Sequence, residues 1–179
     1  LGVQKDEKEA VRCYQLAANQ GDADAEYALG VMYARGLGVQ KDEKEAVRLY
    51  QLAADQGKVE AQRQLGMMYA NGLGVQKDEK EAVRCYQLAA IQGDADAEYA
   101  LGVMYANGKG VQKDEREAAR LYRLAADQGK AEAQNYLGWM YEKGTGVPQD
   151  AIEATRLYRL AADQGDASAQ CNLGWMYRS

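Results

Sequence analysis

Apolar residues recur at helical spacing in two alternating kinds of segment. In residues 42–56, "DEKEAVRLYQLAADQ", five of them fall on one helical stripe: Ala46, Leu49, Tyr50, Ala53 and Ala54. A second stripe in residues 59–70 carries Ala61, Leu65, Met68 and Tyr69. We name the two kinds after their letters, YxLAA helices and LGxMY helices. Each stripe covers only one side of its helix, so each helix must pack that side against a neighbouring helix.

The two kinds of helix repeat at a fixed interval along the chain. "GVQKD" begins at residues 2, 38, 74 and 110, and "GVPQD" begins at 146, which gives a period of 36 residues. Neither helix of a period buries its apolar stripe alone, whereas stacked helix pairs share a continuous core. The pattern therefore predicts an all-α protein, an α-solenoid of about ten helices in antiparallel pairs.

Polar residues mark the ends of the YxLAA helices. Asp42 precedes one of them and Glu45 follows three residues later, which predicts a capping box with Asp as the cap. The same pair occurs at Asp6/Glu9, Asp78/Glu81, Asp114/Glu117 and Asp150/Glu153. Gly57 and its equivalents Gly21, Gly93, Gly129 and Gly165 predict helix stops.

Composition and charge exclude several classes of protein. The 179 residues carry a net charge of −5 and no basic run, so we expect no nucleic-acid partner. No apolar stretch approaches the roughly 18 residues of a membrane span, so we expect no membrane insertion. The chain begins inside a motif and without Met, and we expect it to be an excised fragment. Its compartment is left open, although unpaired cysteines favour the cytoplasm.

The three cysteines predict neither a disulfide framework nor a metal site. Cys13 and Cys85 stand at a place that other repeats fill with leucine, which predicts small buried hydrophobic residues, and Cys171 is left over. The chain has no His, so we expect no metal and no cofactor. Repetition also argues against the single asymmetric constellation that an active site needs, and we expect no enzyme.

The segment "LGVMYARGLGVQKDEKEAVRLYQLAADQG" at 29–57 resembles the Sel-one-like repeat, a relative of the tetratricopeptide repeat. The family's phasing gives one repeat domain over 1–179, with full repeats at 22–57, 58–93, 94–129 and 130–165 and half repeats at 1–21 and 166–179. The resemblance implies a right-handed superhelix whose concave face is lined by the LGxMY helices. It also implies a scaffold or adaptor. Some cysteine-rich bacterial relatives are linked to β-lactam binding, but their paired cysteines are absent here.

Comparison of the chain with itself shows which face varies. Residues 2–37 and 74–109 differ at three positions, and residues 38–73 and 110–145 differ at ten, of which most lie in the LGxMY helix or the loop after it. Recent duplication and consensus-style design both explain this. Helical geometry turns the variable positions away from the Leu/Tyr stripe, and we predict a partner-binding concave face made of Asp24, Tyr27, Val31, Glu60, Arg63, Met67, Asp96, Tyr99, Val103, Glu132, Asn135, Trp139, Glu142, Cys171 and Trp175.

Each feature of this face also has a structural interpretation. Trp139 and Trp175 are interface anchors or fill space between helices. The acidic column of Asp24, Glu60, Asp96 and Glu132 attracts a basic partner or stabilises the first helical turn. The repeated tyrosines equivalent to Tyr33 and Tyr50 are expected in the core.

The predicted function is a scaffold that binds a protein or peptide in the concave groove. Two alternatives stay open at this point: a designed or idealised solenoid without a ligand, and a β-lactam-binding relative or enzyme. Neither terminal helix has an obvious polar cap, so end-to-end self-association is a further expectation.

Overall fold

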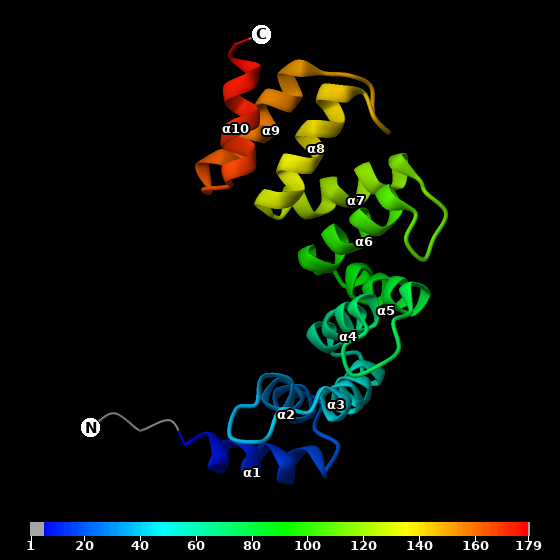
Figure 1. Cartoon of the computed structure of the whole chain (residues 1–179), viewed down its shortest axis with the longest axis vertical. Coiled ribbons are helices and arrows are strands. Elements are labelled where there is room, and N and C mark those ends of the chain that lie inside the picture. Colours follow the sequence, from blue (N-terminus) through cyan, green and yellow to red (C-terminus); the bar gives the residue numbers. More distant parts are fainter. Residues whose placement is uncertain (1–5, 179) are drawn as a thin grey trace, which may run out of the picture. The chain divides into compact units, whose positions relative to one another are not determined.

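The computed structural model describes residues 6–178, which form ten α-helices and no strand (Figure 1). The YxLAA helices are α1 (Glu7–Ala18), α3 (Glu43–Asp55), α5 (Glu79–Ile91), α7 (Glu115–Asp127) and α9 (Ala151–Asp163). The LGxMY helices are α2 (Ala23–Arg35), α4 (Val59–Asn71), α6 (Ala95–Asn107), α8 (Ala131–Lys143) and α10 (Ala167–Met176). Successive helices pack on one another, which confirms the predicted α-solenoid of helix pairs.

The helices divide into two compact units, Leu1–Ala89 and Ala90–Ser179, and the division falls within α5. Each unit repeats the same pairing. In the second, α6 packs on α7 and α8 on α9, and α10 packs back on α9. A single repeat domain across all 179 residues stays a prediction.

The Asp caps form as predicted, but the capping box is only half made. Asp42 Oδ1 accepts hydrogen bonds from the backbone N–H groups of Lys44 and Glu45, at 3.0 and 3.1 Å. The reciprocal bond is absent, because the N–H of Asp42 donates to the carbonyl of Tyr33 at 3.0 Å and Glu45 pairs with Arg48 at 2.7 Å. The same Asp N–H bond ties α5, α7 and α9 to the LGxMY helix before them.

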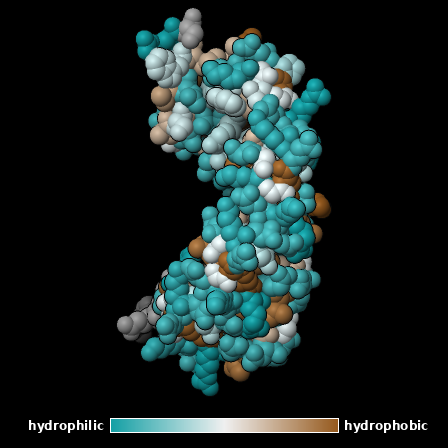
Figure 2. Space-filling view, turned by 45° about the vertical axis from the view of Figure 1, so that its right-hand side comes forward, coloured by the Kyte–Doolittle hydropathy of each residue, from teal (hydrophilic) through white to brown (hydrophobic). Residues whose placement is uncertain are grey.

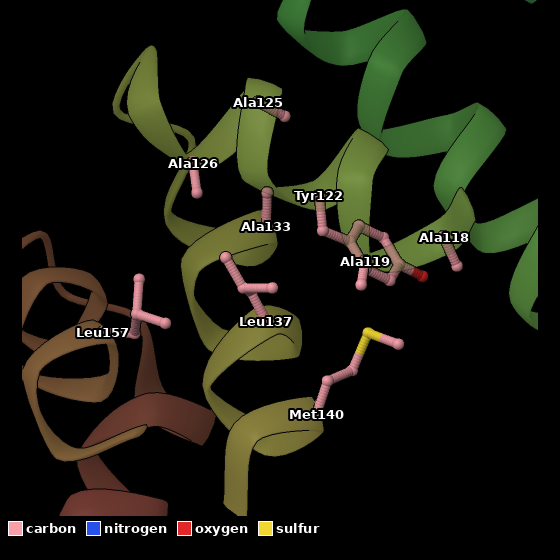
Figure 3. Close-up of a cluster of buried hydrophobic side chains, with 9 residues drawn as sticks. All are labelled: Ala118, Ala119, Tyr122, Ala125, Ala126, Ala133, Leu137, Met140 and Leu157. Carbon is pink, nitrogen blue, oxygen red and sulfur yellow. The ribbon is translucent and has the colours of Figure 1, made fainter. Parts of the chain in front are cut away.

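The core of the second unit is built from alanines with a few large side chains between them (Figure 3). Tyr122 of α7 and Leu137 and Met140 of α8 are almost fully buried, and Leu157 of α9 joins them. Alanine at the remaining contact points lets the helices approach closely. The equivalent cluster in the first unit contains Tyr50, Leu65, Met68 and Cys85.

The ring of each buried tyrosine packs directly against a helical glycine of the preceding LGxMY helix. A Cβ atom at Gly102 would lie 2.8 Å from the ring of Tyr122, and one at Gly138 would lie 3.0 Å from the ring of Tyr158. Gly30 and Gly66 make the same approach to Tyr50 and Tyr86. The glycine costs helix propensity, by about 1 kcal/mol relative to Ala, but any side chain would displace the ring.

The two repeated tyrosine series differ in burial. Tyr50, Tyr86, Tyr122 and Tyr158 are buried as predicted. The second series, Tyr33, Tyr69, Tyr105 and Tyr141, is only half-buried, so the prediction of core tyrosines was wrong in part for this series. These rings pack at the rim of the clusters, and the Tyr141 hydroxyl accepts a hydrogen bond from Arg123. Tyrosine suits the rim of a core cluster, because its ring is apolar and its hydroxyl can form hydrogen bonds.

Of the two cysteines expected to be buried, only Cys85 is. It lies in the first unit's core, and burial raises the pKa of its thiol to about 11. Cys13, at the equivalent place on α1, is exposed, and the prediction was wrong there. The reason is that α3 and α4 cover Cys85, whereas no helix pair precedes α1 within the residues that the structure describes.

One buried polar position per repeat is filled by Glu26, Gln62, Glu98 or Gln134. Glu98 Oε2 accepts a hydrogen bond from Gln128 Nε2 at 2.8 Å, and Gln134 Oε1 accepts the same bond from Gln164 at 2.8 Å. Burial raises the pKa of Glu98, and the bond from Gln128 offsets part of this. A buried charge at this position is therefore a cost that glutamine avoids.

Glu98→Gln is expected to raise the free energy of unfolding at pH 7 by about 1 kcal/mol, because it removes a desolvated charge and keeps the bond from Gln128. A carboxyl whose folded pKa is raised stabilises the fold below its unfolded pKa and loses that contribution as the pH rises. The gain should therefore vanish near pH 4, where Glu98 is itself protonated. Urea denaturation at both pH values measures this, and a pH-independent gain would contradict it.

Candidate interaction surface

The predicted partner-binding residues lie on the LGxMY helices, and the position after Leu-Gly exposes a large apolar side chain on three of them. Met67, Trp139 and Trp175 occupy this position on α4, α8 and α10 and are 40%, 44% and 60% exposed. Val31 and Val103 occupy it on α2 and α6 and are half-buried. Large apolar side chains at an exposed position contribute little to the core, so their place in the fold is compatible with contact to a partner.

The acidic column is partly neutralised within each unit by a lysine. Lys58 Nζ lies 2.7 Å from Asp24 Oδ1 and 3.3 Å from Glu60 Oε2. Lys130 Nζ lies 2.8 Å from Asp96 Oδ1 and 3.1 Å from Glu132 Oε2. Two carboxylates thus share one ammonium group in each case.

Sequence reasoning missed these two lysines. Both stand at the N-cap of an LGxMY helix, where neither makes a side-chain capping bond. The same place holds Asp22, Asp94 and Asp166 in the other repeats, and those aspartates cap their helices. The alternation of Asp and Lys at one repeat position was the available signal, because a lysine at an N-cap opposes the helix dipole and needs another role.

The carboxylates also serve their own helices. The backbone N–H of Glu132 and the ammonium of Lys130 both lower the pKa of Glu132. This side chain lies in the first turn of α8, where a negative charge favours the helix dipole. The carboxylates of the acidic column can therefore stabilise their own helices and also bind a partner.

The two tyrosines predicted to face outward are half-buried. Tyr27 packs against Tyr50 with ring centroids 5.8 Å apart, and Tyr99 packs against Tyr122 at the same distance. The ammonium groups of the two bridging lysines lie over these rings, Lys58 at 5.9 Å from Tyr27 and Lys130 at 5.5 Å from Tyr99. Each lysine is thus held by both ion pairs and a cation–π contact.

A further aromatic residue extends this arrangement in the second unit. Tyr136 on α8 is 46% exposed and stacks on Tyr122 at 5.6 Å, with Tyr99 5.9 Å away. Three rings therefore form a continuous cluster from the core to the surface of α6, α7 and α8. Sequence comparison marked this position as variable, but it did not predict the stacking.

The remaining predicted residues are placed differently from one another. Arg63 is half-buried, and Asn135 accepts a hydrogen bond from Asn172 at 3.0 Å. Glu142 is engaged by Lys143 at 2.5 Å and by the Tyr158 hydroxyl at 2.8 Å, which lower its pKa. Cys171 is exposed on α10.

Hydrophilic side chains cover most of the face that Figure 2 shows, and hydrophobic ones are scattered among them. Across residues 6–178, no group of three or more His, Cys, Asp or Glu residues is arranged to hold a metal ion. Over the same range, every helix is too short or too polar to cross a membrane.

The model of the Sel1 repeat matches the chain over residues 1–22, 23–58, 59–94, 95–130, 131–166 and 167–179. Each boundary falls one residue after the corresponding boundary predicted from the sequence. No curated protein sequence matches the chain.

Several solved structures resemble the chain. A Sel1 repeat protein from Oxalobacter formigenes is 38% identical, with a TM-score of 0.89 over 99% of this chain and 70% of that one. The uropathogenic Escherichia coli protective antigen c5321 is also 38% identical, with a TM-score of 0.91 over 93% of this chain and 36% of its own length. Helicobacter pylori cysteine rich protein B is 26% identical, with a TM-score of 0.59 over 74% of this chain and 95% of that one.

Proposed function

Because the chain belongs to the Sel1 repeat family, whose members are generally non-catalytic scaffolds for protein–protein interactions, we propose that it binds a peptide or protein segment on the face of its LGxMY helices. The observation that carries the proposal is the exposure of Trp139 and Trp175 one repeat apart in the second unit. Tryptophan is among the residues most enriched at the energetic centres of interfaces.

The side chains that accompany Trp139 on α8 favour a partner of particular chemistry, whereas the Arg178 guanidinium lies over the Trp175 ring, 5.0 Å from its centroid. Tyr136 adds a third exposed aromatic ring on α8, and Glu132 adds a carboxylate that Lys130 shares with Asp96. Such a surface suits an extended segment with apolar side chains flanked by Lys or Arg. Apolar burial would supply affinity, and the carboxylates would supply orientation and a faster association.

The rigidity of the scaffold supports the same function. Backbone bonds from each Asp cap, such as Asp150 N–H to the Tyr141 carbonyl at 2.9 Å, fix the loop between consecutive repeats. The Asn172–Asn135 hydrogen bond ties α10 to α8, the two helices that carry the tryptophans. A surface held in place before binding loses little conformational entropy when a partner arrives.

The test is a selection of displayed random peptides on the chain, followed by affinity measurements with the selected peptides on Trp139→Ala plus Trp175→Ala. We expect this double variant to bind at least about tenfold more weakly, because both apolar anchors are lost. The change in tryptophan emission on adding peptide to the unmodified chain gives a second readout.

The matched control is Leu52→Ala plus Leu124→Ala, since both leucines are 39% exposed but lie on YxLAA helices. This control should bind the selected peptides as the unmodified chain does. Equal binding by the tryptophan double variant would overturn the proposed surface, and a selection that enriches no peptide would favour a solenoid without a dedicated ligand.

A further inference from the structure

The exposed residue after Leu-Gly changes together with the residue three places further along the chain. The pairs are Val31 and Ala34 on α2, Met67 and Ala70 on α4, Val103 and Ala106 on α6, Trp139 and Glu142 on α8, and Trp175 and Arg178 at the end of α10. Residues three apart on a helix are neighbours on its surface. Each tryptophan therefore has a charged neighbour where the smaller side chains have alanine.

The two tryptophans have neighbours of opposite charge. The Arg178 guanidinium lies over the Trp175 ring at 5.0 Å, a cation–π contact within the chain. Trp139 has the Glu142 carboxylate in place of that guanidinium, and no lysine or arginine of residues 6–178 lies over its ring. The Trp139 side chain, which is 44% exposed, thus combines an aromatic surface with a neighbouring acid.

The Glu142 carboxylate is held in place and charged. Its Oε1 lies 2.5 Å from Lys143 Nζ, and its Oε2 accepts a hydrogen bond from the buried Tyr158 hydroxyl at 2.8 Å. The hydrogen bond from Lys143, and to a smaller extent that from Tyr158, lowers the pKa of Glu142. Lys143 is exposed, and an exposed ion pair contributes little, so another cation can take its place on Glu142.

A guanidinium fits this arrangement better than an ammonium does. Its planar group stacks on an aromatic ring while its N–H groups donate to a carboxylate, whereas an ammonium is a compact point charge. Tyr136, three residues before Trp139 and 46% exposed, supplies a second ring on the same face of α8. The chain itself stacks a guanidinium on an aromatic ring elsewhere, since Arg123 lies over Tyr141 at 5.6 Å.

We propose that Tyr136, Trp139 and Glu142 form an arginine-selective subsite on α8, in which a guanidinium stacks on the Trp139 ring and pairs with Glu142. This inference rests on the proposed function, because the arginine belongs to the bound segment. The arginine then fixes the position of the segment along α8. The same places on α4 hold Gln64, Met67 and Ala70, so the first unit has no equivalent subsite on that helix.

Nuclear magnetic resonance of the isotopically labelled chain tests the subsite with two probes, N-acetyl-arginine amide and N-acetyl-lysine amide. The chain has two tryptophans and so gives two indole N–H signals, and Trp175→Met assigns them by removing one. We expect the arginine amide to shift the Trp139 signal and to bind at least about threefold more tightly than the lysine amide, because only the guanidinium both stacks and donates two parallel bonds.

Two substitutions on α8 should change this affinity in opposite directions. Glu142→Gln keeps an acceptor for the Tyr158 hydroxyl but removes the charge, and it should weaken binding of the arginine amide at least about threefold. Lys143→Asn introduces the residue found at the same place on α4 and α6, and it should strengthen binding, because a competing cation is lost. Asp127→Asn on α7 is the control for charge and should bind as the unmodified chain does.

Equal affinities for the two amides, or unchanged binding in Glu142→Gln, would overturn the subsite. Peptides selected on the chain give a separate readout, and each is expected to lose affinity when its arginine is replaced by lysine. Selected peptides that contain no arginine, yet bind more weakly to Trp139→Ala plus Trp175→Ala, would overturn the subsite and leave the proposed surface intact. The amides need no partner segment, so a selection that enriches no peptide counts against the proposed function alone.

Discussion

Tyr122→Ala is expected to lower the free energy of unfolding by about 3–5 kcal/mol, the largest single effect we predict, because it removes a large ring from a closed core. Tyr122 is 2% exposed and contacts Gly102 on α6. Its ring also stacks on Tyr136 at 5.6 Å and lies tilted against Tyr99 at 5.8 Å, so its loss both opens a cavity and breaks the aromatic cluster. Urea denaturation followed by far-ultraviolet circular dichroism measures the loss.

The matched control is Tyr14→Ala, the same substitution at the equivalent position of α1. Tyr14 is 39% exposed, so less apolar area is lost and the cost should stay below about 2 kcal/mol. Equal costs at the two positions would show that the burial of Tyr122 does not determine its contribution.

Gly102→Ala is expected to destabilise the protein by about 2 kcal/mol, although alanine is the better helix former. The new methyl group would lie 2.8 and 2.9 Å from two atoms of the Tyr122 ring, which is only 2% exposed. The cost of this overlap exceeds the gain in helix propensity of about 1 kcal/mol. Thermal and urea denaturation of the variant both measure the difference.

Gly174→Ala, at the equivalent position on α10, is expected to have the opposite effect on the free energy of unfolding. With no atom within 4 Å, the methyl group is accommodated, and the variant should be unchanged or up to about 1 kcal/mol more stable. If Gly102→Ala were also stabilising, the glycine of the Leu-Gly motif would not be explained by tyrosine packing.

The sequence predicted the repeat, the helix pairs and the helix ends, because each depends on residues that lie close together in the chain and recur at a fixed spacing. The apolar stripe that contains Leu65 and Met68 can be predicted directly from the sequence, as can the helix start at Asp42 and the helix stop at Gly57. The exposed position of Trp139 also followed from helical geometry alone. Recurrence every 36 residues removed the ambiguity that a single such segment would have had.

Contacts between helices could not be predicted in the same way. The sequence placed Tyr99 outward, but the neighbouring helix provides Tyr122 and covers half of the ring. It showed an acidic column, but only the arrangement of α6 and α8 brings Lys130 between Asp96 and Glu132. The sequence does not explain why the Leu-Gly motif keeps its glycine. The structure does, because the tyrosine of the next YxLAA helix packs directly against it.

The sequence by itself therefore determined which residues form helices, where each helix begins and ends, and which stripe it buries, since these depend on neighbours three or four residues away. Only the tertiary structure decided how deeply each copy of a repeated residue is buried. Cys13 and Cys85 have identical local sequences, and they differ in exposure because burial depends on the helix pair that lies alongside in space.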